Sequence, residues 1–496
     1  MSKSNVVTLQ TRQGNTIKFV HTDSPMSGAM KDVYFSPDKS YVVAFYKEKL
    51  DTQGEQRLEY LLGSYRKAVF EGPEGDYWKE LFCWPTDLVE WKGKIGIVCP
   101  AYDSKYFFSQ GPLKGKEKGG KWFTSASLMN TVVNTKDKGT WLHRIRMCLQ
   151  LVRAVRKLHA VGLAHSDLSY GNVLVDPSTG SATIIDIDGL VVPGKFWPDV
   201  DGSPDFIAPE VMKTKRLKKG DKNKNLPCRY TDLHALAVLI YMYLLNRHPL
   251  KGGKFFSEDT EEEEELMLGT QALFIEHPTD TSNRPNVQDI NSSALPQEDV
   301  TKMPYSICGP FIKKLFDKAF VQGLHNPKCR PTAMEWEGAL VKTVDLMFKC
   351  ENPKCEAKYF VFDNMRQPVC PFCGHKHSSH LPVLNLYEAI RDDGTFSPVD
   401  HRIVVYDGLP IFKWQTDRSI FPNEKLKDEH KPPVADCQIV NGKWWLINRR
   451  LPNLVSIRKD KTKVPVPIGT AVELEEGTKL LFDSSKSSRL AFVQIL

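Results

Sequence analysis

The chain has 496 residues, of which 41% are hydrophobic and 26% charged, and its formal net charge is +7. This length is too great for one hydrophobic core, so about three domains are expected. The modest positive charge does not by itself indicate nucleic-acid binding. No apolar run approaches the ~18–20 residues that span a membrane, and the N-terminus lacks the apolar segment of a secretion signal. We therefore expect a soluble protein that binds neither nucleic acid nor membrane.

The cysteine pattern indicates a reducing compartment. Four of the 11 cysteines form two close pairs, Cys350 with Cys355 and Cys370 with Cys373, and the others are scattered singly. An odd, dispersed set argues against a disulfide framework. We expect a cytoplasmic location.

In chain order, residues 30–105 combine short β-rich runs with one helical stretch, "EQRLEYLLGSYRKAVF". From Trp141 to about His159 apolar residues recur at helical spacing, and Gly162 follows as the C-cap. The segment that begins at Asp232, "DLHALAVLIYMYLL", is apolar on every side, which is typical of a buried central helix.

Two charged stretches come next. "KTKRLKKGDKNKN" from Lys213 is interpreted as a solvated loop, with a docking patch for an acidic partner as the alternative. "EDTEEEEE" from Glu258 is interpreted as an exposed helix start, because acidic residues favour the first turn. The helical pattern ends near Phe348, and from about Ile403 short strands alternate with Gly, Pro and Asn turns, which predicts an all-β domain.

Three polar residues lie among apolar neighbours. Asp167 and Asn172 stand five apart in the loop after a helix, and Asp186 ends an apolar strand. One carboxylate can accept a proton from a substrate hydroxyl, while the amide oxygen and the second carboxylate hold Mg²⁺ against nucleotide phosphates. The pattern predicts phosphoryl transfer with Asp167 as the base and with Asn172 and Asp186 as metal ligands.

These residues resemble the catalytic motifs of the protein kinase family. His165, Asp167 and Asn172 match the spacing of its H-R-D-L-x-x-x-N loop, and "DID" at Asp186–Asp188 stands where the family has D-F-G. The resemblance implies ATP as the phosphate donor and Mg²⁺ or Mn²⁺ as the metal. His165 is expected to be a scaffold residue rather than a proton carrier.

Further motifs follow in the order that kinases have. "GSPDFIAPE", which ends at Glu210, resembles the end of the activation segment with its A-P-E sequence. Asp232 opens the buried helix, and Arg330 stands where kinases pair an arginine with the A-P-E glutamate. The resemblance covers roughly residues 25–345 and implies an α+β protein-kinase-like bilobal fold.

The same resemblance implies a nucleotide site in the N-terminal part. Gly28 lies where a glycine-rich loop belongs. Lys47 is the expected phosphate anchor, with Lys49 as the alternative, and Glu59 is its expected carboxylate partner, with Glu55 as the alternative. "GIVCPAYD" resembles the hinge, so the gatekeeper and the backbone that meets adenine are expected at Val98, Cys99, Ala101 and Tyr102.

Three departures from the kinase pattern and one match concern regulation and substrate. Ser166 replaces the arginine of H-R-D, so activity is expected to be independent of activation-segment phosphorylation. Ser169 stands where Ser/Thr kinases often carry lysine. Asp188 replaces the glycine of D-F-G and either faces the metal or bonds the backbone. Ser203 matches a position that favours Ser/Thr over Tyr substrates.

"CENPKC" and "CPFCG" present two turn-borne cysteine pairs. Four thiolates in tetrahedral geometry select Zn²⁺ in a closed structural site. We therefore predict a zinc ribbon, with unrelated buried cysteines as the alternative, and its ligands are Cys350, Cys355, Cys370 and Cys373. His375 and His377 are expected at the surface, because four sulfurs fill the metal shell.

The last ~95 residues resemble a forkhead-associated (FHA) domain, a β-sandwich that usually binds phosphothreonine, in "GKWWLINRRLPNLVSI" and "VPIGTAVELEEGTKLLF". Arg418 falls where the family has its phosphate-binding arginine, and Asn453 matches a further family residue. The Ser-x-x-His motif is not visible, since Cys437 occupies the histidine position. The alternative is a docking module of the same shape.

The expected organisation is a kinase N-lobe at 1–103, a C-lobe at 104–348, a zinc ribbon at 349–380 and an FHA-like sandwich at 381–496. This order resembles bacterial Ser/Thr kinases encoded with tellurite-resistance-type (TerY-like) proteins, which implies a cognate phosphatase and a von Willebrand A-like protein as partners. The alternative functions are a nucleotide-binding pseudokinase scaffold and a small-molecule kinase.

Overall fold

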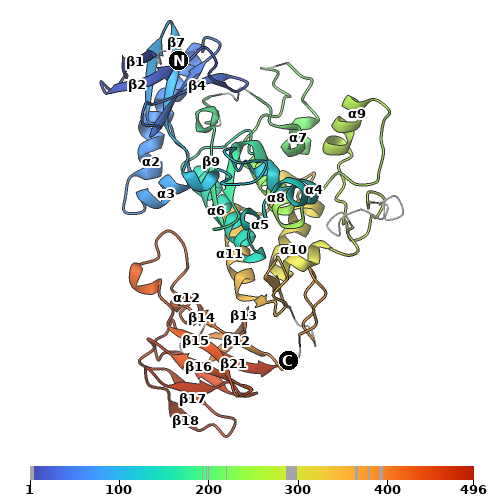
Figure 1. The fold of residues 1–496 in the computed structure, drawn as a ribbon. Helices are drawn as coiled ribbons and strands as arrows, with labels where there is room; N and C mark the ends of the chain where they lie inside the picture. Colours follow the sequence, from blue (N-terminus) through green and yellow to red (C-terminus); the bar gives the residue numbers. More distant parts are fainter. Residues whose placement is uncertain are drawn as a thin grey trace. The chain divides into compact units, whose positions relative to one another are not determined.

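A computed structural model describes residues 5–192, 194–196, 198, 200–218, 220–285, 299–363, 367–377, 380–389 and 395–496. They form two compact units (Figure 1). The first comprises Met1–Gly139, Arg146–Pro304 and Leu315–Glu337, and the second comprises Thr140–Ile145, Tyr305–Lys314 and Gly338–Leu496.

The first unit begins with two antiparallel sheets. A hairpin of β1 (Asn5–Gln10) and β2 (Thr16–His21) precedes a five-stranded sheet of order β3-β4-β5-β7-β6. Its strands are β3 (Met26–Ser27), β4 (Lys31–Phe35), β5 (Tyr41–Tyr46), β6 (Asp87–Trp91) and β7 (Lys94–Pro100). The predicted helical stretch lies between β5 and β6 as α1 (Thr52–Tyr60), a π-helical turn and α2 (Arg66–Phe70), followed by α3 (Gly75–Leu81).

The two faces of this sheet form separate clusters because side chains alternate along a strand. Val43 and Phe45 pack on one face with Phe19 of β2. Ala44 and Tyr46 pack on the other face with Leu58 of α1. This alternation decides which side chains of β5 can reach the candidate site.

Helices dominate the rest of the first unit. The central helix α8 (Arg229–Leu245) is buried from Thr231 to Leu245, as its apolar sequence predicts. The hairpin of β8 (Val173–Asp176) and β9 (Ser181–Ile184) follows α6. The other helices of this unit are α4 (Ala126–Val132), α5 (Thr135–Lys138), α7 (Pro209–Met212) and α9 (Thr260–Glu265). Residues of α6 (Trp141–Ala160), α10 (Pro310–Asp317) and α11 (Ala333–Asp345) are divided between the two units.

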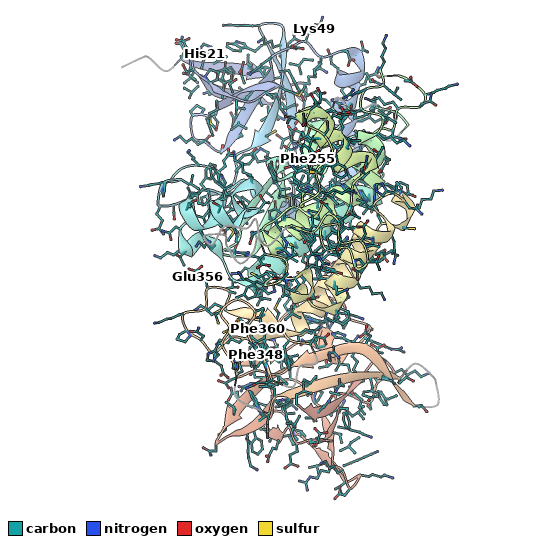
Figure 2. All side chains as sticks on the ribbon, turned by 90° about the vertical axis from the view of Figure 1, so that its right-hand side faces the viewer. His21, Lys49, Phe255, Phe348, Glu356 and Phe360 are labelled. Atoms are coloured by element: carbon teal, nitrogen blue, oxygen red, sulfur yellow. The ribbon has the colours of Figure 1, made fainter. Side chains whose placement is uncertain are left out.

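The second unit contains a small hairpin and a two-sheet antiparallel sandwich. In the hairpin of β10 (Met347–Lys349) and β11 (Tyr359–Val361), Phe348 pairs with Phe360, and their ring centroids are 5.6 Å apart (Figure 2). The sandwich joins a six-stranded sheet of order β13-β12-β21-β20-β17-β18 to a four-stranded sheet of order β14-β15-β16-β19. The all-β pattern expected from about Ile403 onward is therefore present, and it begins earlier, with β12.

The strands of the larger sheet are β12 (Pro382–Ala389), β13 (Phe396–Val404), β17 (Val455–Ile457), β18 (Lys463–Pro465), β20 (Lys479–Leu481) and β21 (Arg489–Ile495). Those of the smaller sheet are β14 (Leu409–Ile411), β15 (Ala435–Val440), β16 (Lys443–Asn448) and β19 (Ala471–Glu473), with the short helix α12 (Lys413–Thr416) between β14 and β15. Side chains of both sheets form one core, which includes Leu384, Leu446, Leu480 and Val493. Across the described ranges, no helix is long and apolar enough to cross a membrane.

Candidate active site

Asp232 contacts both the end of α6 and the loop that follows it. Gly162 has φ +84°, which turns the chain after the helix. One oxygen of Asp232, Oδ2, accepts a hydrogen bond from the backbone amide of His165 at 2.9 Å and lies 3.0 Å from Nε2 of His159. The ring of His165 is buried, with Nε2 3.1 Å from the carbonyl oxygen of Ile185. His165 and Asp232 thus support the loop, as expected for scaffold residues.

Asp167 and Asn172 lie in direct contact. The amide nitrogen Nδ2 of Asn172 donates to the backbone oxygen of Asp167 at 2.8 Å and to its Oδ2 at 3.0 Å. The backbone amide of Ile185 donates to the carbonyl of Asn172 at 3.0 Å, which brings Asp186 beside this pair. Asp186 has a left-handed φ of +59°, and its side chain is 47% exposed. An amide oxygen and carboxylates are hard ligands, so this donor set fits Mg²⁺ or Mn²⁺.

The segment before A-P-E reaches the same place. The backbone amide of Ser203 donates to Oδ1 of Asp167 at 2.6 Å. Gly202 has φ +114°, and a Cβ there would lie 3.2 Å from the carbonyl oxygen of Ser166, so the close approach favours glycine. Asp167 is therefore oriented from two sides, by Asn172 and by the activation segment.

The predicted pair of Glu210 and Arg330 is formed. Both guanidinium nitrogens Nη1 and Nη2 of Arg330 donate to Glu210 at 2.7 Å. The same guanidinium donates to the carbonyls of Gly323, Tyr230 and Leu324, and its side chain is fully buried. This bidentate contact ties α7 to the segment before α11.

The basic segment from Lys213 is mainly exposed among its described residues, as expected for a solvated loop, and Thr214, Lys215 and Lys224 are half-buried. The ammonium of Lys224 donates to Oδ2 of Asp201 at 2.9 Å and to the carbonyls of Lys215 and Leu217. One lysine of this segment thus contacts the activation segment.

The expected ion pair of Lys47 with Glu59 is not formed. The Nζ atom of Lys47 donates to the carbonyl of Gly28 at 2.5 Å, and both Lys47 and Lys49 are exposed. Arg12 forms ion pairs with both candidate glutamates, at 2.9 Å with Glu59 and at 3.3 Å with Glu55. The structure therefore does not support the assignment of Lys47 and Glu59 to the phosphate site as an ion pair.

Lys31 of β4 lies beside Asp186, a predicted metal ligand, instead. Its Nζ donates to Oδ1 of Asp186 at 2.9 Å and to the two oxygens of Asp188 at 2.7 and 2.6 Å. The hydroxyl of Tyr46 also donates to Asp188. Lys31 and Asp188 are mostly buried, with side chains 17% and 7% exposed. Sequence reasoning missed Lys31, and it had left open whether Asp188 faces the metal or the backbone.

Strand geometry explains why Lys31, and not Lys47, reaches Asp186 and Asp188. Antiparallel pairing places Lys31 opposite Tyr46, and opposed residues share a sheet face. Lys47 stands one position further and so faces the other way. Aligning "VAFY" with the V-A-x-K pattern of kinases would have put Tyr46, not Lys47, at the lysine position.

The charges in this cluster stabilise one another. Burial acts against the charge of Lys31, but Asp188 and Asp186 outweigh it and raise its pKa. Burial also opposes ionisation of Asp188, but the charge and hydrogen bonds of Lys31 keep its pKa below the ordinary value. Burial and the nearby Asp188 raise the pKa of Tyr46, so it stays a neutral donor.

The hinge prediction falls at the end of β7. Val98 is buried and pairs with Val43 and Asp87 on either side. The amide of Ala101 donates to the carbonyl of Ser40 at 3.1 Å, so an adenine contact from Ala101 would have to use its carbonyl. Cys99 lies near the end of β7 and Tyr102 lies just after this strand. Their contact with adenine stays a prediction.

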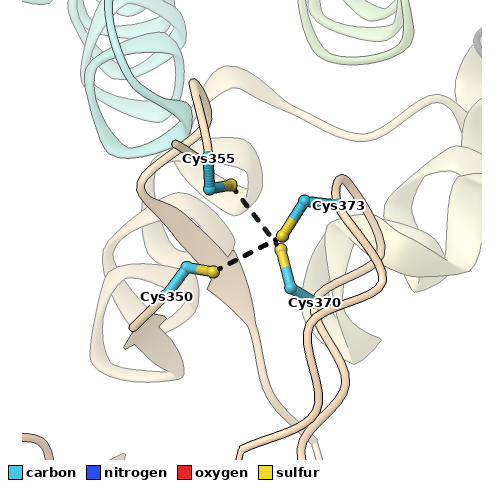
Figure 3. A group of neighbouring side chains, drawn as sticks. All are labelled: Cys350, Cys355, Cys370 and Cys373. Carbon is cyan, nitrogen blue, oxygen red and sulfur yellow. Dashed lines mark hydrogen bonds between the residues drawn. The ribbon is translucent and has the colours of Figure 1, made fainter. Parts of the chain in front are cut away.

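The four paired cysteines gather in the second unit, where their side chains turn toward one centre (Figure 3). The Sγ atoms of Cys350 and Cys373 are 3.7 Å apart, and those of Cys355 and Cys370 are 3.8 Å apart. A tetrahedron of sulfurs with Zn–S bonds of ~2.3 Å has edges of about 3.8 Å, whereas a disulfide needs ~2.05 Å. The four thiols thus fit a zinc ion.

A second group lies near the cysteines. Glu351, His375 and His377 present ligand atoms within 4.8 Å of one another. His377 is 1% exposed, its Nδ1 lies 3.2 Å from Glu351, and its ring packs edge-on against Phe348. The expectation that His377 is a surface residue is therefore wrong, because the aromatic hairpin covers it.

In the sandwich, Arg418 is exposed in the link between β14 and β15, and its backbone amide donates to the carbonyl of Ser487 at 2.9 Å. Asn453 donates to Asp483 at 3.0 Å. Cys437 is fully buried in β15, so it belongs to the core and not to a binding surface. Arg418 is thus the predicted phosphate-binding residue that is available to a ligand.

Comparison with known proteins agrees with this geometry. Residues 123–336 match the family model of the protein kinase domain. "Probable serine/threonine-protein kinase RTK1" of Saccharomyces cerevisiae is 29% identical over 138 residues, which are 25% of this chain and 21% of that protein. "Serine/threonine-protein kinase H1" of Homo sapiens is 33% identical over 122 residues, 23% of this chain and 26% of that protein.

A solved structure of ROP2 from Toxoplasma gondii, whose title describes a protein-kinase fold and no enzymatic activity, has a TM-score of 0.40 and 14% identity. The matched region covers 68% of this chain and 85% of the ROP2 chain. The chain spans about a quarter or less of the length of the curated relatives described above. The family match is confined to residues 123–336, and the two curated relatives are described as Ser/Thr kinases.

Proposed function

We propose that this chain is an ATP-dependent Ser/Thr protein kinase. The observation that carries the proposal is the orientation of Asp167 by Asn172 and by the amide of Ser203, with Asp186 alongside. A divalent cation, when bound, neutralises charge on the phosphates. Asp167 holds a substrate hydroxyl and accepts its proton as the oxygen–phosphorus bond forms and ADP leaves. Asn172 and Asp186 are the oxygen ligands for the metal.

Substrate class and regulation follow from the activation segment. Ser203 is hydrogen-bonded to the base through its backbone, which supports a peptide platform that ends at Glu210. The position of Ser203 in the sequence favours Ser/Thr residues over Tyr as the phosphate acceptors. Ser166 cannot clamp a phosphate as an arginine would, which supports activity without activation-segment phosphorylation.

The second unit supplies two accessory modules in this proposal. A zinc ion held by the four cysteines stabilises a segment that has little core of its own. The antiparallel sandwich is an FHA-like module that binds a phosphothreonine peptide through exposed Arg418, whose guanidinium suits phosphate. A bacterial source, a cognate phosphatase and a von Willebrand A-like partner rest on the resemblance to TerY-associated kinases alone.

The test is transfer of labelled phosphate from ATP to a generic Ser/Thr substrate and to the chain itself. Wild type should label protein, Asp167→Asn should lose about 10³-fold or more, and Asp186→Ala should abolish autophosphorylation found by mass spectrometry. Equal label in wild type and Asp167→Asn would eliminate this site. Nucleotide binding without transfer would establish the scaffold alternative, and transfer to a metabolite but never to protein would establish a small-molecule kinase.

A further inference from the structure

We propose that Lys31 is the phosphate anchor of the nucleotide site and that Asp188, rather than a carboxylate of helix α1, is its ion-pair partner. The inference rests on the proposed function for its ligand, a nucleoside triphosphate with a divalent cation. It changes both halves of the lysine–glutamate pair that the kinase resemblance implies. Tyr46 is a positioning residue that holds Asp188.

The first support is the place of the lysine nitrogen. Nζ of Lys31 lies 2.9 Å from Oδ1 of Asp186, a predicted metal ligand, so its charge is already at the point where metal and phosphate meet. Its side chain is 17% exposed and reaches this point from β4, the strand that follows the turn at Gly28. A lysine ammonium is a compact charge well suited to phosphate.

The second support is that the competing lysines point elsewhere. Lys47 contacts the carbonyl of Gly28, and Lys49 lies exposed in the link between β5 and α1 (Figure 2). On β5, the residue that faces the site is Tyr46, and a neutral phenol cannot replace the charge. Lys31 stands opposite Tyr46 in the ladder, so the neighbouring strand supplies the cation that β5 lacks.

The third support is the composition of α1. Its buried residues are Gly54, Arg57 and Leu58, so the charged residue on its inner face is a cation, which cannot pair with a lysine. Its glutamates, Glu55 and Glu59, contact Arg12 instead.

Asp188 fills the missing role. It is 5% exposed and accepts from both Lys31 and Tyr46. A buried carboxylate requires such partners. Since Asp188 lies two residues after Asp186, the partner of the anchor and the predicted metal ligand sit on one turn, and the Lys31–Asp188 pair forms without any contribution from α1. Movements of α1 should therefore leave the phosphate anchor in place.

The proposal is tested first by covalent mapping on the full chain. An acyl-phosphate derivative of ATP transfers its acyl group to the lysine amine nearest the phosphates, with release of ATP and a proton. Peptide mapping should find the modification on Lys31, and excess ATP should suppress it. Modification of Lys47 or Lys49 with Lys31 untouched would overturn the assignment.

Affinity for Mg·ATP, measured by calorimetry, gives a second readout. Lys31→Met should weaken binding by at least about tenfold, as expected for loss of a charge-assisted contact, and Lys31→Arg should restore part of it. Lys47→Met should change affinity less than about twofold. Equal loss in Lys31→Met and Lys47→Met would refute the anchor role.

The partner is tested with Tyr46→Phe and Asp188→Asn against Glu59→Gln. Tyr46→Phe removes one hydroxyl and should raise KM for ATP about threefold to tenfold while KM for a peptide substrate stays constant; a general structural defect would affect the two KM values alike. Asp188→Asn should do more, and Glu59→Gln should match wild type. An effect of Glu59→Gln as large as that of Asp188→Asn would restore the usual pair and refute ours.

These readouts separate the two proposals. Labelling at Lys31 in a chain without phosphotransfer would refute the kinase function and keep the anchor. Phosphotransfer with labelling at Lys47 would keep the function and refute the anchor. A chain that binds no nucleotide would refute both.

Discussion

Arg330 offers a prediction whose size follows from its contacts. Replacing Arg330 with methionine keeps the volume and removes the charge. It leaves Glu210, which is only 24% exposed, without its bidentate partner, and three carbonyls lose a donor. Removing one member of a buried pair costs about 3–5 kcal/mol. In a domain of ~200 residues this lowers the melting midpoint on the order of 10 °C.

The assay is thermal unfolding of the full chain, followed by intrinsic fluorescence, together with phosphotransfer at a temperature where both proteins are folded. Arg216→Met is the matched control, because Arg216 also pairs with a glutamate, Glu265, but its side chain is 69% exposed. The control should show no measurable shift. Equal unfolding midpoints for Arg330→Met and Arg216→Met would show that the Glu210–Arg330 pair does not stabilise the folded domain.

Three further predictions concern other parts of the chain. Chelation should release about one Zn²⁺ per chain, and Cys370→Ser should prevent loading; full stability of the metal-free protein would contradict a structural site. Burial lowers the pKa of His248 to about 4, so the unfolded chain binds a proton that the folded chain excludes between about pH 6.5 and 4, and stability falls as pH falls through that window. This contributes about 2 kcal/mol between pH 7 and 5, and denaturant titrations of His248→Gln should show a correspondingly flatter pH dependence. Lys224→Met should increase hydrogen exchange around Asp201 and slow phosphotransfer, whereas exposed Lys222→Met should change neither.

The catalytic loop could be predicted because its residues are close together in the sequence. Asp167 and Asn172 lie within one short loop, so their spacing alone brings the amide to the carboxylate. The pairing of Glu210 with Arg330, 120 residues apart, was predictable only through the resemblance to kinases. The cysteine pairs were predictable because each pair shares one turn.

The phosphate anchor could not be predicted in the same way. Lys31 and Asp188 are 157 residues apart, and no local pattern joins them. The position of Lys47 at the end of an apolar strand favours it as the anchor, but a shift of one residue along a strand moves a side chain to the opposite face. His377 was misjudged for a related reason, since its burial depends on the rings of Phe348 and Phe360.

By itself, then, the amino-acid sequence determined which residues come together within single loops and turns, such as Asp167 with Asn172 and the two cysteine pairs, because these contacts depend on spacing along the chain. Only the tertiary structure decided which lysine meets Asp186, which further carboxylate pairs with that lysine and what covers His377. Those outcomes depend on strand pairing and on side chains brought together from distant segments, where a difference of one residue changes the face and therefore the partner.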